Sequence, residues 1–191
     1  MNKRIIVAMS ALVLGGVDVQ ASAADVSRGS SGHFGFVGEL DLEFGGDDIA
    51  EVQFTNGSTQ TVKAGQGGTL AIGGHYRPAN SDFDFSATVG YKFVTTAASN
   101  ADIGVDRVVF KALVIYDPAN SWWVAAGPVW HDGTKFHGDG FVSDIKFDDA
   151  VGFTAQAGWK WIGLTYTNME YKFRGIKVDG SSIGLSLTWR G

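Results

Sequence analysis

Three acidic residues near the start of the chain, Glu39, Asp41 and Glu43, are spaced two apart with leucines between them. Side chains along a β-strand point alternately to its two faces, so the three carboxylates share one face. Basic and imidazole side chains occur in later segments. His75 and Arg77 are two residues apart, Arg107 and Lys111 are four apart, and Lys92 lies between these pairs. The candidate site residues are Glu39, Asp41, Glu43, His75, Arg77, Lys92, Arg107 and Lys111.

These charged residues have two possible roles. If their faces line the inside of a barrel, unpaired charges would be costly there, so acids of the first strand should pair with bases of neighbouring strands. Asp84 and Lys160 would belong to the same set, and Ser182, Ser186 and Thr188 could donate hydrogen bonds to the carboxylates. The favoured interpretation is a polar network that fixes strand register. The alternative is a narrow or gated conduit for small solutes, or a lateral path for apolar ones.

A second group of chemically competent residues lies between residues 131 and 149. It contains His131, Asp132, His137, Asp139, Asp144, Asp148 and Asp149. Carboxylates and imidazoles can bind divalent cations, but this spacing matches no known metal-binding loop. We therefore expect a solvated acidic loop, no metal site and no cofactor.

The element that best indicates the fold is the segment Asp82 to Phe93. Its odd-numbered residues are aromatic or apolar, and its even-numbered residues are Asp82, Asp84, Ser86, Thr88, Gly90 and Lys92. This period of two predicts a strand with one apolar and one polar face. The length matches the roughly 9–11 residues that a tilted strand needs to cross a bilayer.

Seven other segments resemble it, and together the eight predict a β-barrel. The segments are 32–44, 69–77, 82–93, 105–116, 122–130, 150–160, 162–173 and 181–189. Pro128 cannot donate to a strand ladder, so we expect a bulge or an early strand end there. A change of phase between Tyr166 and Met169 predicts another bulge.

The connections between these segments differ in length in a regular way. Residues 45–68, 94–104 and 131–149 are long polar loops and 175–180 is a moderate one, whereas 78–81, 117–121 and the region of Trp161 are short turns. Asn56-Gly57 predicts a small hairpin at the tip of the first loop. Outer-membrane barrels have short periplasmic turns and longer loops outside.

Aromatic residues also gather at the two ends of the expected strands. Those beside the short turns or the C-terminus are Tyr76, Phe83, Tyr116, Trp122, Trp123, Trp159, Trp161 and Trp189. Those beside the long loops are Phe44, Tyr91, Phe93, Trp130 and Phe173. Two such belts are typical of strands that cross both interfaces of a membrane.

The N-terminal region predicts export. Lys3 and Arg4 precede an apolar run, and Ala21-Ser22-Ala23 offers a cleavage site, so we expect residues 1–23 to be a signal peptide and 24–191 one barrel domain. The chain has no cysteine and a net charge of −5. Without a basic cluster, nucleic-acid binding is not expected.

With these features the chain resembles the small Gram-negative outer-membrane β-barrels, the group of the OmpA membrane domain, OmpX, OmpW and the opacity proteins. The most family-like piece runs from G-L-T-Y-T-N-M-E-Y-K-F to V-D-G-S-S-I-G-L-S-L-T-W. The resemblance implies an all-β, eight-stranded antiparallel up-and-down transmembrane barrel with both termini in the periplasm. Family members usually end on an aromatic residue that aids assembly, whereas here Trp189 is followed by Arg190 and Gly191.

The expected function is that of a structural or passive outer-membrane protein. Such a role covers envelope integrity, limited permeation of small or hydrophobic solutes, and contacts through surface loops. The expected partners are outer-membrane lipid, lipopolysaccharide and, during biogenesis, the barrel-assembly machinery, with the protein itself a monomer. The alternative is a soluble exported β-barrel that binds a small apolar ligand.

A lipid-modifying outer-membrane enzyme is a third alternative, and we do not expect it. Barrel hydrolases of the lipid A deacylase type need a His and a Ser on adjacent outward positions of a late strand. Here residues 162–173 contain no His, and His33, His75, His131 and His137 are scattered over other segments. The chain also lacks a G-x-S-x-G sequence.

Overall fold

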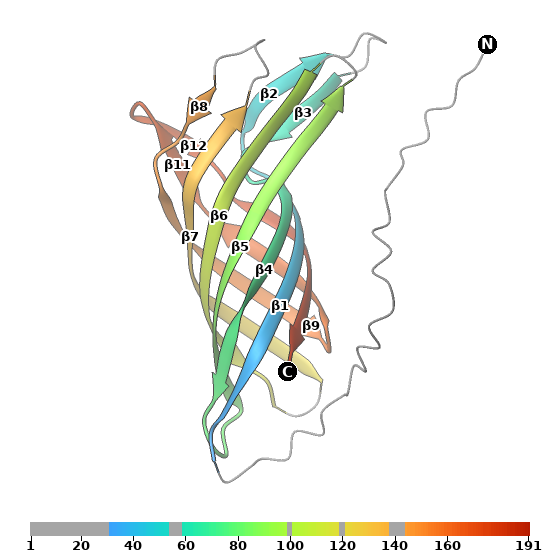
Figure 1. Ribbon diagram of the computed structural model, residues 1–191, viewed down its shortest axis with the longest axis vertical. Helices are drawn as coiled ribbons and strands as arrows, with labels where there is room; N and C mark the ends of the chain where they lie inside the picture. Colours follow the sequence, from blue (N-terminus) through green and yellow to red (C-terminus); the bar gives the residue numbers. More distant parts are fainter. Residues whose placement is uncertain (1–30, 54–58, 99–100, 119–120, 138–143) are drawn as a thin grey trace, which may run out of the picture.

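The computed structural model describes residues 31–53, 59–98, 101–118, 121–137 and 144–191. The expected signal peptide and the Asn56-Gly57 tip lie outside these residues. Eight strands form the wall of a barrel (Figure 1). They are β1 (His33–Phe44), β4 (Gly67–Arg77), β5 (Phe83–Ala98), β6 (Ala101–Tyr116), β7 (Trp122–His137), β9 (Ala150–Trp159), β10 (Ile162–Asn168) and β13 (Ser182–Arg190).

Each barrel strand pairs antiparallel with the barrel strand before and after it in sequence. The order β6-β5-β4-β1-β13-β10-β9-β7 closes on itself through the pairing of β6 with β7. The first and last strands meet with Leu40 opposite Leu187. The predicted fold class, an all-β eight-stranded antiparallel up-and-down barrel, is confirmed.

The polarity of the wall is the reverse of that of a water-soluble barrel. Phe85, Val89, Phe153 and Leu185 point outward and are 43–54% exposed, whereas Lys92 and Arg107 point into the lumen and are each 1% exposed. On β5, Phe83 and Phe93 are ten residues apart. At about 3.3 Å per residue and a tilt of about 40°, that span rises ~25 Å, the height of the apolar band of a membrane barrel.

Five shorter strands belong to the long connections. Between β1 and β4 lies the hairpin β2 (Asp48–Gln53) and β3 (Thr59–Lys63), which confirms a hairpin in the first loop. Strand β8 (Ile145–Lys146) pairs with the end of β7, and β11 (Glu170–Phe173) pairs with β12 (Ile176–Asp179). We call the end of the barrel that carries these strands the loop end and the opposite end the turn end (Figure 1).

The strands at the loop end are longer than predicted. Residues 94–104 are not a polar loop, because β5 and β6 stay paired as far as Ala98 and Ala101. Likewise β7 continues through His131 to His137, inside the segment expected to be the third loop. Beyond the apolar band the outer face no longer needs apolar residues, so the alternation that marks a strand in the sequence fades there.

Neither predicted bulge lies at its expected position. Strand β7 runs through Pro128, which points outward and is exposed, and the register shift of the β6–β7 pair lies between Asp106 and Val108, near Gly133 with its φ of 64°. The phase also does not change between Tyr166 and Met169: Thr167, Met169 and Tyr171 are all buried on the inner side. Met169 is an apolar residue at an inner position, and in the sequence this looks like a change of face.

The two aromatic belts are present, with two corrections. Phe34, Phe83, Trp159, Trp161 and Trp189 are exposed at the turn end, and Phe44, Tyr91, Phe93 and Trp130 at the loop end. Trp123 instead points into the lumen, where its indole donates a hydrogen bond to the Lys160 carbonyl at 2.8 Å. Phe173 packs against the buried apolar cluster of the loop end. Lys160 itself is an exposed turn residue with a φ of 54°, not a lumen residue.

None of the described residues forms a helix of the length and hydrophobicity that a membrane-crossing helix requires.

The reversed polarity predicts that one substitution has a large effect at one exposed aliphatic residue and almost none at another. Val89 lies midway along the outer face of β5, and Ile176 lies at the tip of the β11–β12 hairpin. We expect Val89→Lys to lower the free energy of unfolding by about 2–4 kcal/mol, because it places a charge near the bilayer midplane. Ile176→Lys, the matched control, should be nearly neutral.

The measurement is urea unfolding of both variants folded into phospholipid vesicles. In a water-soluble barrel both positions would face solvent, so equal and small effects at Val89 and Ile176 would contradict a membrane-facing wall.

Candidate functional site

The central feature of the lumen is one lysine that bridges two carboxylates of β1. Lys111 Nζ, from β6, lies 2.7 Å from Glu39 Oε1 and 2.7 Å from Asp41 Oδ2. Gln156 Nε2, from β9, donates a second hydrogen bond to Glu39 Oε1 at 2.6 Å. All four side chains are buried, so these charge-assisted hydrogen bonds replace the water that the groups lose on folding.

A second ion pair lies nearer the loop end. Lys92 Nζ, from β5, donates to Glu43 Oε2 at 2.6 Å. The other oxygen, Oε1, accepts hydrogen bonds from Thr167 Oγ1 at 3.0 Å and Ser182 Oγ at 2.8 Å. Both oxygens of Glu43 are therefore engaged by three different strands.

The partners of these acids differ from those predicted. Strand β1 is flanked by β4 and β13, yet the lysines that neutralise its carboxylates come from β5 and β6. Eight strands enclose an interior that side chains can span, so a long lysine reaches the acid across the lumen. The predicted hydrogen bond from β13 is made by Ser182, whereas the Ser186 hydroxyl lies 3.2 Å from that of Thr188.

A third group of charges occupies the turn end of the lumen. His75 Nδ1 lies 2.8 Å from Asp84 Oδ2, and His75 Nε2 lies 3.2 Å from the Gly191 carbonyl oxygen. Both ring nitrogens thus face acceptors, as in a doubly protonated imidazole. Asp117, directly after β6, accepts from Arg77 at 3.2 Å and lies 3.3 Å from Arg190, so β4 and β13 are joined here to the end of β6.

The lack of a side chain at Gly35 leaves room for this group. A Cβ at Gly35 would lie 2.3 Å from His75 Nε2 and 1.8 Å from the Gly191 oxygen, so a side chain there would displace both. Opposite the charges lies an apolar group on β6 and β7, formed by Leu113, Ile115, Trp123 and Ala125, with the Arg190 guanidinium 5.3 Å from the Trp123 ring centroid.

At the loop end, an apolar cluster covers the lumen; we call it the cap cluster. Hairpin β2–β3, strands β6 and β7, the segment before β9 and the region of β11 supply the side chains of this cluster. Its buried members are Val62, Ala64, Val105, Val109, Val129, Phe136, Phe147, Ala150, Met169 and Tyr171.

Backbone contacts between the connections hold the cap cluster in place. Asp47 N donates to the Asp179 carbonyl at 2.8 Å, and Asp179 N donates to Asp47 Oδ2 at 2.8 Å. Hydrogen bonds from Ser181 hold the pKa of the Asp179 carboxyl below its usual range, which keeps it charged. The β2–β3 and β11–β12 hairpins are therefore fixed to each other above the lumen.

Seven of the eight predicted site residues fall into three groups. Glu39, Asp41 and Lys111 form one, and Glu43 with Lys92 forms the second. His75 and Arg77 belong to the group at the turn end. Arg107 is buried beside Lys92 on the neighbouring strand, and within the described part of the chain it forms no ion pair with the acids of β1. The network is thus layered along the barrel axis, and a binding role for it stays a prediction.

Several residues of these groups were not among the predicted site residues. Asp84 and Ser182 were predicted to face the lumen with them, and Gln156 could have been included, because it has the parity of an inward position on its strand. Tyr171 and Trp123 could not, since aromatic residues near strand ends usually face the membrane interface.

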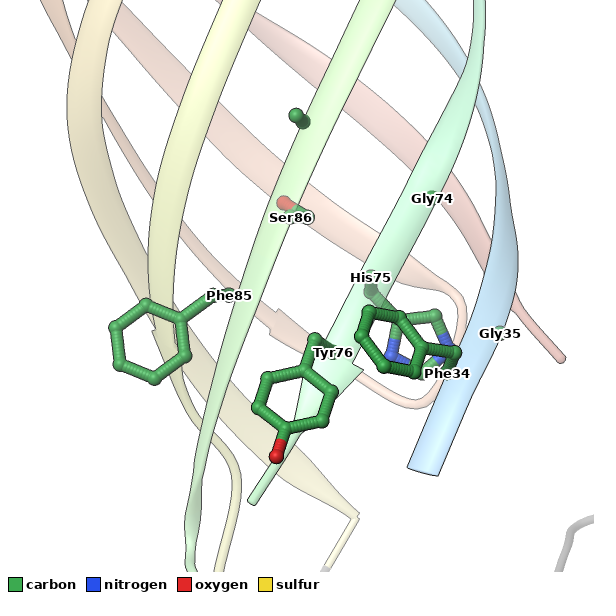
Figure 2. A pocket seen from close by; sticks show the side chains of 8 residues that line it. Phe34, Gly35, Gly74, His75, Tyr76, Phe85 and Ser86 are labelled. Carbon is green, nitrogen blue, oxygen red and sulfur yellow. The ribbon is translucent and has the colours of Figure 1, made fainter. Parts of the chain in front are cut away.

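One hollow of about 350 Å³ lies on the outer surface at the turn end. Figure 2 shows Phe34, Tyr76 and Phe85 around it, on β1, β4 and β5. It exists because Gly74 presents no side chain among these rings. Three aromatic walls on the outside of the barrel suit contact with lipid chains, and the lumen residues His75 and Ser86 also line the hollow.

The acidic residues of the third connection do not converge. Asp132, Asp148 and Asp149 are exposed, and His137 pairs with Asp106 at 2.6 Å. Asp139 lies outside the described residues. Within the described ranges no group of three or more His, Asp or Glu side chains has the arrangement of a metal site.

Because Lys111 contacts both Glu39 and Asp41, its removal should destabilise the protein as long as the two carboxylates remain. Lys111→Met would leave Glu39 and Asp41 buried without a cation, so we expect the free energy of unfolding to fall by about 3–5 kcal/mol. Adding Glu39→Gln and Asp41→Asn should restore most of it, because neutral amides need no counter-charge. Urea unfolding of the single and triple variants tests this coupling, and a triple variant no more stable than Lys111→Met would contradict it.

The close packing of Gly180 against the Tyr171 ring in the cap cluster predicts a second loss of stability. A Cβ at Gly180 would lie 2.2 Å from Tyr171 Cε2. We expect Gly180→Ala to push the ring out of its packed position and to cost about 1–3 kcal/mol. At Gly38 an added Cβ would meet atoms no nearer than 3.8 Å, so Gly38→Ala is the matched control. Equal melting temperatures for the two variants would argue against the packed cap.

Comparisons with known proteins identify no family for this chain. No family model and no curated protein match the sequence. Among solved structures, neisserial surface protein A is 13% identical, with 82% of this chain and 98% of that chain covered and a TM-score of 0.41. The attachment invasion locus protein Ail of Yersinia pestis, solved in complex with the heparin analogue sucrose octasulfate, is 11% identical, with 83% and 99% covered and a TM-score of 0.40.

The fold is established by the chain's own strand order, closure and polarity. The chain has the fold of the small eight-stranded outer-membrane β-barrels.

Proposed function

We propose that this protein is an integral outer-membrane protein with a structural or passive role in the envelope. The observation that supports it is the reversal of polarity: large apolar side chains face outward between two aromatic belts, and charged side chains are paired inside. Exposing such a wall to water would leave a continuous apolar surface, whereas a bilayer covers it.

The filled lumen favours a structural role over conduction. Lys92 and Lys111 cross the lumen to β1, and the cap cluster covers the loop end. A solute would have to break buried ion pairs and displace the packed hairpins. A free passage for small or hydrophobic solutes is therefore the weaker part of the proposal.

The alternative of a soluble barrel with an apolar ligand inside is disfavoured by the same arrangement. Such a carrier needs an apolar interior. Here the middle of the lumen is occupied by Glu39, Asp41, Lys92 and Lys111. Outer-membrane lipid and lipopolysaccharide are the partners that the outer wall suits, with assembly machinery acting during insertion and a monomer as the final state.

Two measurements on the full chain test this proposal. After expression in a Gram-negative host, the protein should co-fractionate with the outer membrane, and its folded form should migrate differently from the heated form on a detergent gel. Recovery in the soluble periplasmic fraction with no heat-dependent mobility would contradict membrane residence.

The closed lumen is tested separately. Purified barrels inserted into planar bilayers should show no sustained single-channel steps, and vesicles that contain them should not swell in small sugars. An open porin measured in parallel provides the positive control. Steady conductance by the unmodified protein would contradict the structural role and would leave membrane residence intact.

A further inference from the structure

His131 is a buried imidazole that the proposed structural role does not use. It lies on β7, directly after Trp130 of the loop-end aromatic belt, and is 3% exposed. Its cross-strand neighbours are Val109 on β6 and Ala150 on β9, both members of the cap cluster. The next inward residue of β6 toward the turn end is Lys111. The imidazole therefore lies at the boundary between the cap cluster and the charged part of the lumen.

The imidazole is also attached to the aromatic centre of the cap cluster. His131 Nδ1 forms a hydrogen bond with the Tyr171 hydroxyl, and the two rings are stacked with their centroids 5.8 Å apart. Tyr171 is 2% exposed and contacts the Phe147 ring, with centroids 6.0 Å apart. One histidine thus connects β7 to β11 and, through Tyr171, to the segment before β9.

The charged groups that act on this imidazole from the neighbouring strands are cations. Arg107 and Lys111 lie on either side of Val109 on β6, and Lys92 lies on β5. The Arg107 guanidinium carbon is 5.5 Å from the centroid of the same Tyr171 ring. A proton on His131 would therefore add a fourth positive charge to this region.

The buried acids of the region leave no negative charge to offset a fourth cation. The three buried carboxylates of β1 balance the three buried cations of β5 and β6. Asp132, on β7, and Asp148 and Asp149, before β9, are exposed. The Asp149 carboxylate accepts a hydrogen bond from the Gly133 backbone at 3.2 Å. An imidazolium at His131 would be both buried and uncompensated, which is costly.

We propose that His131 is an acid-sensitive latch, and that its protonation releases the cap cluster from the loop end of the lumen. A neutral imidazole can accept the proton of the Tyr171 hydroxyl and pack beneath the cap without cost. An imidazolium gains free energy by reaching water, and it can do so only if Tyr171 and the β11–β12 hairpin move away. Opening is thereby coupled to the uptake of one proton.

This inference goes beyond the proposed structural role and concerns only the cap cluster. Lys92 and Lys111 cross the lumen beneath it, so release of the cap leaves their ion pairs in place. The Asp47–Asp179 contact between the two hairpins does not explain an effect of mild acid, because hydrogen bonds keep the pKa of Asp179 below its usual range.

The test measures access to a cap residue as a function of pH. The chain has no cysteine, so Val62→Cys introduces one buried thiol into the cap cluster, and Ile176→Cys introduces an exposed one at the hairpin tip. The full chain is folded in a zwitterionic detergent and treated with a dipyridyl disulfide, which reacts with thiols in acid as well. The ratio of the buried rate to the exposed rate corrects for the effect of pH on the reagent.

In the wild-type background this ratio should rise as the pH falls. Because each opening takes up one proton, the rise should approach about tenfold per pH unit between about pH 7 and about pH 5. His131→Gln, which is neutral and retains a hydrogen-bonding group, should make the ratio independent of pH. His137→Gln is the matched control: His137 is exposed and pairs with Asp106, so the rise should remain.

A second variant covers the case in which His131→Gln does not fold. His131→Phe retains a ring that can stack on Tyr171 and removes the titrating group, so it should also give a ratio independent of pH. The imidazole resonances of histidine-labelled protein provide a direct readout. The resonance that is absent from either variant should titrate over the same pH range in which the rate ratio rises.

A ratio independent of pH in the wild-type background would overturn the proposal, as would an undiminished rise in His131→Gln or His131→Phe. Neither result bears on membrane residence, because the heat-dependent gel mobility of the folded barrel is recorded for every sample. Recovery of the protein in the periplasmic fraction would contradict membrane residence and would leave the rate ratio unaffected.

Discussion

The ion pairs that cross the lumen are the interaction on which this structure depends. A closed eight-stranded wall leaves no room for bulk water inside, so every inward charge must find a partner among the other inward side chains. Lys111 and Lys92 meet this requirement by reaching β1 from β6 and β5. These contacts join strands that share no backbone hydrogen bonds, and they act as braces across the cylinder in addition to the ladders around it.

The cap cluster is the second consequence of closure. At the loop end the inward positions change from charged to apolar: Met169 and Tyr171 follow Thr167 with the same parity, and Val62 and Phe136 meet them from other strands. The protein thus has a small water-excluding core like that of a soluble domain, placed on top of a charged lumen. Burial of this core supplies stability that the membrane-facing wall cannot, because lipid chains are as apolar as the side chains that face them.

Different kinds of side-chain contact close the two ends of the barrel, because the connections at the two ends differ in length. At the turn end the connections are too short to fold inward, so Arg77 and Arg190 form ion pairs with Asp84 around His75 where the strands begin and end. At the loop end the connections are long enough to form hairpins of their own, and apolar side chains do the covering. Arg107 lies at the loop end opposite Lys92, and its guanidinium carbon is 5.5 Å from the centroid of the Tyr171 ring of the cap cluster.

The amino-acid sequence by itself determined the eight strands, their faces and the inward direction of residues such as Glu39, Lys92 and Lys111, because a period of two can be read from local order alone. It did not determine which acid meets which base, since pairing across a lumen depends on strand tilt and side-chain length. Nor did it reveal the inward places of Trp123 and Tyr171, or the run of β5 and β6 beyond the apolar band. Those depend on contacts between distant segments, which exist only once the cylinder has closed.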